Sequence, residues 1–209
     1  MYTLISSYFS KFAPLAVIFL FFSSNQVLGN SNSKENISAK INLLHDSLKK
    51  ISESETNNKK DLQDILQVIK QTYDTKKMIR MIVGRQWKNL GKEEKSDLVN
   101  IFQEYISHNY LKRFKKINEF NFENIGIDQF GENYKIFKTL MVIPDEDQIK
   151  INYLLHKKNG DWRIFDILLS GSISEIATKK SEFKKIIKKG GIKLLIQEIK
   201  KKNNSNYGH

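Results

Sequence analysis

Residues 160–175 decide the fold and read GDWRIFDILLSGSISE. The pattern predicts a tight turn, then a strand, then a glycine and serine break that starts a helix. Simple alternation makes both faces of the strand apolar. One face would carry Trp162, Ile164 and Leu168, and the other would carry Phe165, Ile167 and Leu169. A strand with two apolar faces must be covered on both sides, so we expect apolar elements against each face.

Three segments upstream also show the alternation of strands, namely residues 120–127, 133–143 and 148–157. The third alternates most regularly, as a half-buried strand does. Between it and the opening strand stands Asn159-Gly160, a strong hairpin signal. Together the four segments predict an antiparallel meander of about four strands.

Helical periodicity flanks the predicted sheet on both sides. The predicted helices before it cover residues 37–51, 60–69, 76–88 and 92–117, and those after it cover 174–189 and 192–201. Gly84 could end the third of them or let another backbone approach. In the longest of them, 92–117, Arg113 falls inside the apolar stripe, and His108 falls outside it and is expected to be exposed. Helices, then an antiparallel sheet, then helices predict an α+β fold.

The first 29 residues have the features of a signal peptide. Residues 12–22 form an unbroken apolar run, shorter than the ~20 residues needed to span a bilayer. Polar residues and then Val27-Leu28-Gly29 follow, so we expect cleavage after Gly29 and export of the rest to the periplasm. An uncleaved membrane anchor and a buried N-terminal helix are the alternatives. The exported part would be one domain, residues 30–203, with 30–36 disordered and a disordered tail at 204–209.

The composition is strongly basic and lacks cysteine. A formal net charge of +12 favours anionic partners, either nucleic acid or an acidic membrane surface, although the lysines can also be plain solvated surface. Export makes nucleic acid the weaker candidate. Without cysteine there is neither a disulfide nor a thiolate metal site, so the core alone must stabilise the domain.

The sequence gives little support for catalysis. The four histidines are scattered without metal-ligand spacing, and no nucleophile elbow or phosphate-binding glycine loop is present. Asp166 is unusual because it lies in the middle of an apolar strand. It would be either a general acid or base or, more simply, a buried structural carboxylate with satisfied hydrogen bonds or a residue just at the sheet edge.

Four segments, in this order and at this spacing, resemble the MlaC-type periplasmic lipid-binding proteins, also called toluene-tolerance proteins. They are MIVGRQWK at 81–88, FQEYI at 102–106 followed by Tyr110 and Arg113-Phe114, DWRIFD at 161–166, and GSISEIATKKSEF at 171–183. After Gly171, Ser172-Ile173-Ser174-Glu175 stands where better-known members have a Gly-Val-Ser pattern. This difference places the chain nearer the HpnM-like branch.

The resemblance implies a soluble carrier and not an enzyme. Members of the family hold acyl chains between a curved sheet and surrounding helices, with the head group near the mouth. The implied cargo is a phospholipid, with no other cofactor and no metal. The implied partners are an inner-membrane ABC transporter with MCE-domain subunits and an outer-membrane lipoprotein complex, which together maintain outer-membrane lipid asymmetry. We expect the carrier to be a monomer that does not bind nucleic acid.

Twelve residues are candidates for the lipid site, eleven as apolar or aromatic cavity wall and Arg113 as a head-group contact. They are Ile82, Val83, Phe102, Tyr105, Ile106, Tyr110, Arg113, Met141, Ile151, Tyr153, Phe165 and Ile167. Two alternatives stay open at this point. One is a cationic module with a solid interior that binds a membrane surface or a polyanion, and the other is a small exported enzyme that uses Asp166 and Tyr153.

Overall fold

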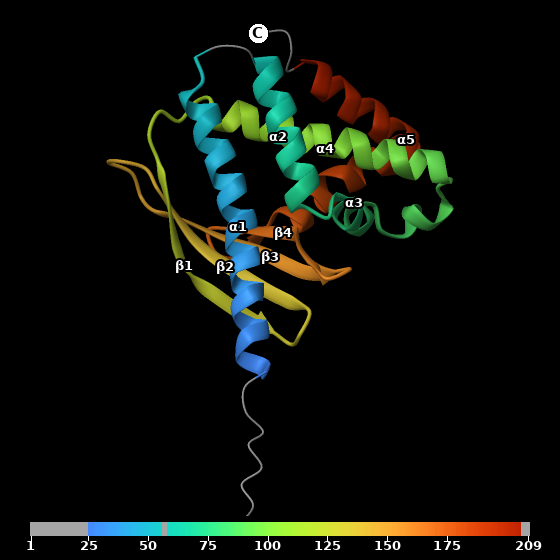
Figure 1. The fold of residues 1–209 in the computed structure, drawn as a ribbon. Helices are drawn as coiled ribbons and strands as arrows, with labels where there is room; N and C mark the ends of the chain where they lie inside the picture. The colour runs from blue at the N-terminus through green and yellow to red at the C-terminus, as the bar shows by residue number, and fades with distance from the viewer. Residues whose placement is uncertain (1–24, 56–57, 206–209) are drawn as a thin grey trace, which may run out of the picture.

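The computed structural model describes residues 25–55 and 58–205 and has the predicted α+β architecture (Figure 1). Helices precede and follow one antiparallel sheet. The elements are α1 (Asn25–Glu53), α2 (Asn58–Thr72), α3 (Thr75–Val83), the 3-10 helix η1 (Gly84–Asn89), α4 (Lys92–Phe114), β1 (Asn121–Phe130), β2 (Tyr134–Val142), β3 (Ile149–Lys158), β4 (Asp161–Leu169), β5 (Ile173–Ser174) and α5 (Glu175–Ser205).

The sheet is a meander in the order β1-β2-β3-β4-β5. Its first four strands are the four that the sequence predicts. The fifth, β5, is a two-residue strand that pairs with Leu168 and Leu169 at the end of β4. Sequence alone assigned Ser174 to the start of a helix, because two residues are too few to show alternation.

A β-bulge in β4 corrects the prediction of two apolar faces. Ile164 pairs with Leu155 and Asp166 pairs with Leu154, which leaves Phe165 as an extra residue. Past the bulge the alternation is reversed, so one face, here called the inner face, carries Trp162, Ile164, Ile167 and Leu169. Phe165 lies on the outer face, half-buried, with the Lys77 ammonium 4.1 Å from its ring centroid.

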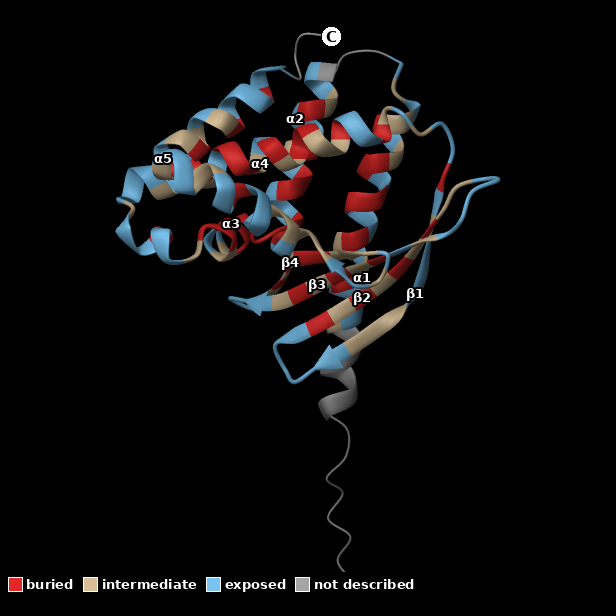
Figure 2. Ribbon diagram, turned by 180° about the vertical axis from the view of Figure 1, so that it is seen from behind, coloured by how far each residue is buried: buried red, intermediate tan, exposed pale blue. Residues whose placement is uncertain are grey.

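α1 packs on the inner face of the sheet. Figures 1 and 2, which view the molecule from opposite sides, show α1 in front of the strands in one and behind them in the other. His45 of α1 stacks on Phe122 of β1, with ring centroids 3.7 Å apart, and its Nε2 lies 3.0 Å from the Tyr153 hydroxyl of β3. Burial, and secondarily Lys49, lowers the pKa of His45 to about 3. His45 is therefore neutral in the folded protein at ordinary pH.

Several helix boundaries differ from the prediction. α1 begins at Asn25, so residues 30–36 are helical and not disordered. α4 ends at Phe114, three residues earlier than predicted. α5 consists of two helical stretches separated at Gly190 and Gly191, as predicted, where Gly191 has a φ of +68°. α5 extends to Ser205. Most of the predicted signal peptide, residues 1–24, and the end of the predicted tail, residues 206–209, lie outside the described residues.

The buried residues form one cluster between the helices and the inner face of the sheet (Figure 2). α4 packs against both α2 and α5. In its middle, residues 98–111, only Asn100 and Glu104 are exposed. His108, which the single-stripe pattern placed on the surface, is consequently buried, and that prediction is wrong. Within the described ranges no helix is long and apolar enough to cross a membrane.

Asp166 joins the end of the sheet to the start of α5. Its carboxylate accepts hydrogen bonds from the Ile167 amide at 2.8 Å, the Ser174 hydroxyl at 2.6 Å and the Ile176 amide at 3.1 Å. The Ile176 amide belongs to the first turn of α5, where amides have no partner within the helix. The buried carboxylate thus has the structural role that the sequence allowed for it.

The first prediction concerns this carboxylate. We expect Asp166→Ala to lower the free energy of unfolding by roughly 2–4 kcal/mol, because it leaves buried donors without an acceptor. Chemical denaturation measures the change. Asp147→Ala, in the exposed turn before β3, is the matched control and should change stability by less than about 0.5 kcal/mol. Equal effects of the two substitutions would contradict the structural role of Asp166.

The second prediction concerns His45. Because its pKa is lower in the folded than in the unfolded chain, the unfolded state binds more protons between pH 6.5 and about 3. The stability that depends on neutral His45 is therefore lost as the pH falls through this window. Between pH 7 and 4.5, the free energy of unfolding should fall about 2–3 kcal/mol further in the wild type than in His45→Gln. Parallel pH profiles for the two proteins would show that His45 does not titrate as proposed.

Candidate functional site

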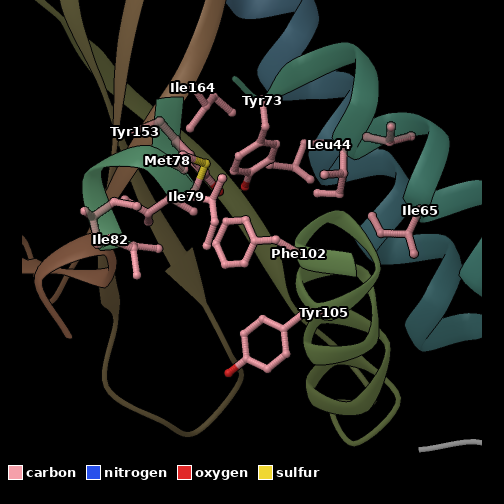
Figure 3. Packing of buried hydrophobic residues seen from close by; sticks show 14 of the residues in the cluster. Leu44, Ile65, Tyr73, Met78, Ile79, Ile82, Phe102, Tyr105, Tyr153 and Ile164 are labelled. Atoms are coloured by element: carbon pink, nitrogen blue, oxygen red, sulfur yellow. The ribbon is translucent and has the colours of Figure 1, made fainter. Parts of the chain in front are cut away.

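A cavity of about 540 Å³ lies between α4 and the inner face of the sheet. This volume falls within the usual range for small-molecule sites. Most of its lining is apolar or aromatic. Those lining residues are Leu48, Tyr73, Met78, Phe102, Tyr105, Ile106, Tyr110, Phe114, Ile117, Phe122, Met141, Ile149, Ile151, Tyr153, Ile167, Leu169 and Ile176. Figure 3 shows three of them, Tyr73, Met78 and Phe102, approaching one another from different elements.

The two walls follow from local periodicity. Residues three and four apart on a helix share one face, which gives α4 a continuous stripe from Phe102 through Ile106 and Tyr110 to Arg113. On the sheet, Met141, Ile151 and Ile167 face the same side, because the antiparallel registers place inner-face residues of neighbouring strands together. The bulge in β4 is needed for this arrangement, since it turns Ile167 and Leu169 to the inner face.

The polar lining residues concentrate where the cavity wall is partly or fully exposed. They are Asn109 and Arg113 from α4 and Lys116 just beyond it, together with Ser170 just after β4 and Glu175 and Lys179 from the start of α5. We call these six residues the mouth. It carries three cationic side chains and one carboxylate. Lys179 is ion-paired with Glu182, whereas Arg113 and Lys116 form no ion pair within the described part of the chain. The mouth therefore favours an anionic group.

Three tyrosine hydroxyls lie within the otherwise apolar interior. The Tyr73 and Tyr110 hydroxyls are 2.5 Å apart, and the Tyr153 hydroxyl is hydrogen-bonded to His45. Burial raises the pKa of Tyr73 and Tyr153 well above the ordinary value, and raises that of Tyr110 to about 12. All three side chains are therefore neutral at physiological pH and can donate hydrogen bonds.

Nine of the twelve candidate residues line this cavity. They are Phe102, Tyr105, Ile106, Tyr110, Arg113, Met141, Ile151, Tyr153 and Ile167. Ile82 and Val83 do not line it. They are buried at the end of α3, one turn beyond Met78, which is the residue of that helix that reaches the cavity. Phe165 does not line it either, because the bulge places its ring on the outer face near Tyr134 and His156.

Sequence reasoning missed some of the lining. Phe114 and Ile117 continue the α4 stripe, so the helical period could have identified them. Phe122 pairs with Met141, and this pairing could be read only after the register of a weakly patterned strand was known. For Tyr73 and Leu48, the neighbouring sequence does not indicate a place in the cavity wall. They reach the cavity only because α1 and the α2–α3 junction pack beside it.

Asp166 does not line the cavity, whereas Tyr153 does. The enzymatic alternative needs both side chains to face one pocket, so the structure does not assemble the acid and base that it requires. The carboxylate instead accepts the three hydrogen bonds described above.

Comparisons with known proteins identify a solved structure with a similar fold and the family of the chain. In structure, the chain is similar to a phospholipid-binding protein from Ralstonia solanacearum, solved in complex with a phospholipid. The TM-score is 0.68 at 18% sequence identity, over 84% of this chain and 98% of the other. No curated protein matches the sequence. The sequence profile of the family described as MlaC protein matches residues 39–201, most of the chain. The chain therefore belongs to the MlaC family.

Proposed function

We propose that this protein is a phospholipid carrier that encloses acyl chains in the cavity between α4 and the sheet. The observation that carries the proposal is an apolar interior joined to a cationic mouth. The fold shared with the Ralstonia solanacearum protein supports it, because that relative was solved with a phospholipid bound.

The physical chemistry of lipids explains why a carrier needs such a cavity. Bringing one acyl methylene into water costs about 0.8 kcal/mol, so two chains with roughly 30 methylenes cost on the order of 20 kcal/mol. A soluble carrier must remove nearly all of that surface from water. Apolar side chains of α4 and the inner face do so without any catalytic group.

The mouth would hold the head group. Arg113 is exposed at the last turn of α4, and Lys116 follows just beyond the helix. Guanidinium groups bind phosphate oxygens in a bidentate manner, which makes Arg113 the principal head-group contact in this proposal.

A cavity of this size also argues against the alternative of a cationic module with a solid interior.

Export and partners complete the proposal. The apolar run at residues 12–22 would direct the chain to the periplasm, where it would work as a monomer. It would pass phospholipid between an inner-membrane ABC transporter with MCE-domain subunits and an outer-membrane lipoprotein complex. Family membership supports this route. Assignment to the HpnM-like branch stays a prediction from residues 172–175.

Blocking the cavity tests the proposal. The full chain, expressed in a bacterial periplasm and purified, should retain extractable phospholipid detectable by native mass spectrometry. Ile106→Trp places an indole inside the cavity and should weaken lipid uptake from liposomes roughly tenfold, since excluding only two methylenes has that effect. Ile125→Trp is the control, because Ile125 is 54% exposed on β1, away from the cavity. A wild-type protein that neither retains nor takes up lipid would refute the carrier function.

Charge reversal tests the mouth. We expect Arg113→Glu to weaken binding of phosphatidylglycerol roughly three- to tenfold, and the loss should shrink at high salt as the charges are screened. Arg85→Glu makes the same change in net charge at an exposed position outside the cavity lining, and should have little effect. If both variants bind equally well, Arg113 does not contact the head group.

A further inference from the structure

We propose that the hydroxyl pair of Tyr73 and Tyr110 recognises the ester carbonyl of the bound lipid and makes the cavity selective for ester-linked chains. This inference rests on the proposed carrier function. It assigns a chemical role to two polar groups that an apolar cavity would not otherwise need.

The pair is held by two separate parts of the fold. Tyr73 lies at the junction of α2 and α3, where its backbone forms a parallel bridge with Ile164 of β4 and its amide donates to the Ile69 carbonyl. Tyr110 projects from the middle of the α4 stripe. Tyr73 is only 4% exposed, and both residues line the cavity. The relative position of the two hydroxyls is therefore fixed by the packing of α4 against α2 and α3.

Hydrogen-bond counting leaves one donor unused. Each tyrosine hydroxyl has one proton and can accept two hydrogen bonds. Tyr73 and Tyr110 share a single bond, and neither hydroxyl has another partner among the described residues. One O–H group consequently has no acceptor inside an apolar cavity, which is energetically unfavourable until a ligand supplies an acceptor. The Tyr153 hydroxyl differs, because its partner is His45.

The pair also lies at the correct depth for an ester. Tyr110 and Arg113 are three residues apart on α4, so their side chains are neighbours on the helix surface. Arg113 is close enough to Tyr110 to act on its pKa, opposing the upward shift caused by burial. In a glycerophospholipid only the glycerol backbone separates the phosphate from the ester carbonyls. A phosphate held at Arg113 would bring a carbonyl oxygen next to the Tyr110 hydroxyl.

This placement predicts that the protein distinguishes ester-linked from ether-linked lipids. An acyl ester presents a carbonyl oxygen, which is a good acceptor, whereas an alkyl ether of the same length has no carbonyl group. Head-group charge and chain length are the same in both lipids. A difference in affinity between them would therefore report on the carbonyl and not on the mouth or the apolar walls.

The experiment compares dihexadecanoyl phosphatidylglycerol with its dihexadecyl ether analogue, using the full chain freed of lipid. Wild-type protein should bind the ester roughly three- to tenfold more tightly, the effect of one hydrogen bond. Either tyrosine alone retains an O–H group, so the decisive variant is the double substitution Tyr73→Phe with Tyr110→Phe. In this double variant the ratio of the affinity for the ester to the affinity for the ether should fall to about one. Tyr134→Phe removes a tyrosine hydroxyl outside the cavity lining, at a residue that is 47% exposed, and should leave the ratio unchanged.

Three outcomes would overturn the inference. Equal wild-type affinity for the two lipids would exclude ester recognition while leaving the carrier function intact, and this comparison does not depend on any variant folding. An ester preference that persists in a folded double variant would place recognition elsewhere. Failure of wild-type protein to bind either lipid would refute the carrier function itself, and the inference with it.

Discussion

The bulge at Phe165 is the constraint on which the two halves of the molecule depend. By inserting one residue into β4, it allows Trp162 and Ile164 to pack into the solid core while Ile167 and Leu169 face the cavity on the same side of the sheet. Without it, regular alternation would turn Ile167 and Leu169 to the outer face. Asp166, the next residue, uses its carboxylate to fix the start of α5 against this part of the strand.

α4 is the opposite wall and divides the interior in a similar way. Its packing against α2 and α5 stabilises the helix along its length, while the stripe from Phe102 to Arg113 faces the cavity. A helix that is held on two sides can leave its third side open without collapsing onto the sheet. The same packing buries His108, which a single amphipathic stripe would have left in solvent.

Polarity increases along α4 from the interior to the surface. Phe102 and Ile106 offer only apolar contact, Tyr110 adds a neutral hydroxyl, and Arg113 adds a positive charge. A glycerophospholipid has the same order of chemical groups, from hydrocarbon through ester to phosphate. The match between these two gradients gives a physical basis for both the carrier function and the ester selectivity that we propose.

The sequence by itself determined the α+β class, the first four strands and most of the helices, and nine of its twelve candidate residues line the cavity, because helical and strand periods encode which face is apolar. The family resemblance carried by residues 81–88, 102–114 and 161–183 is likewise confirmed. Only the tertiary structure decided that Phe165 lies on the outer face of the sheet, and that Ile82 and Val83 are buried in the core and do not line the cavity. It alone also brought Tyr73 to Tyr110. These features depend on strand register and on contacts between segments far apart in the chain, and local periodicity contains no information about either.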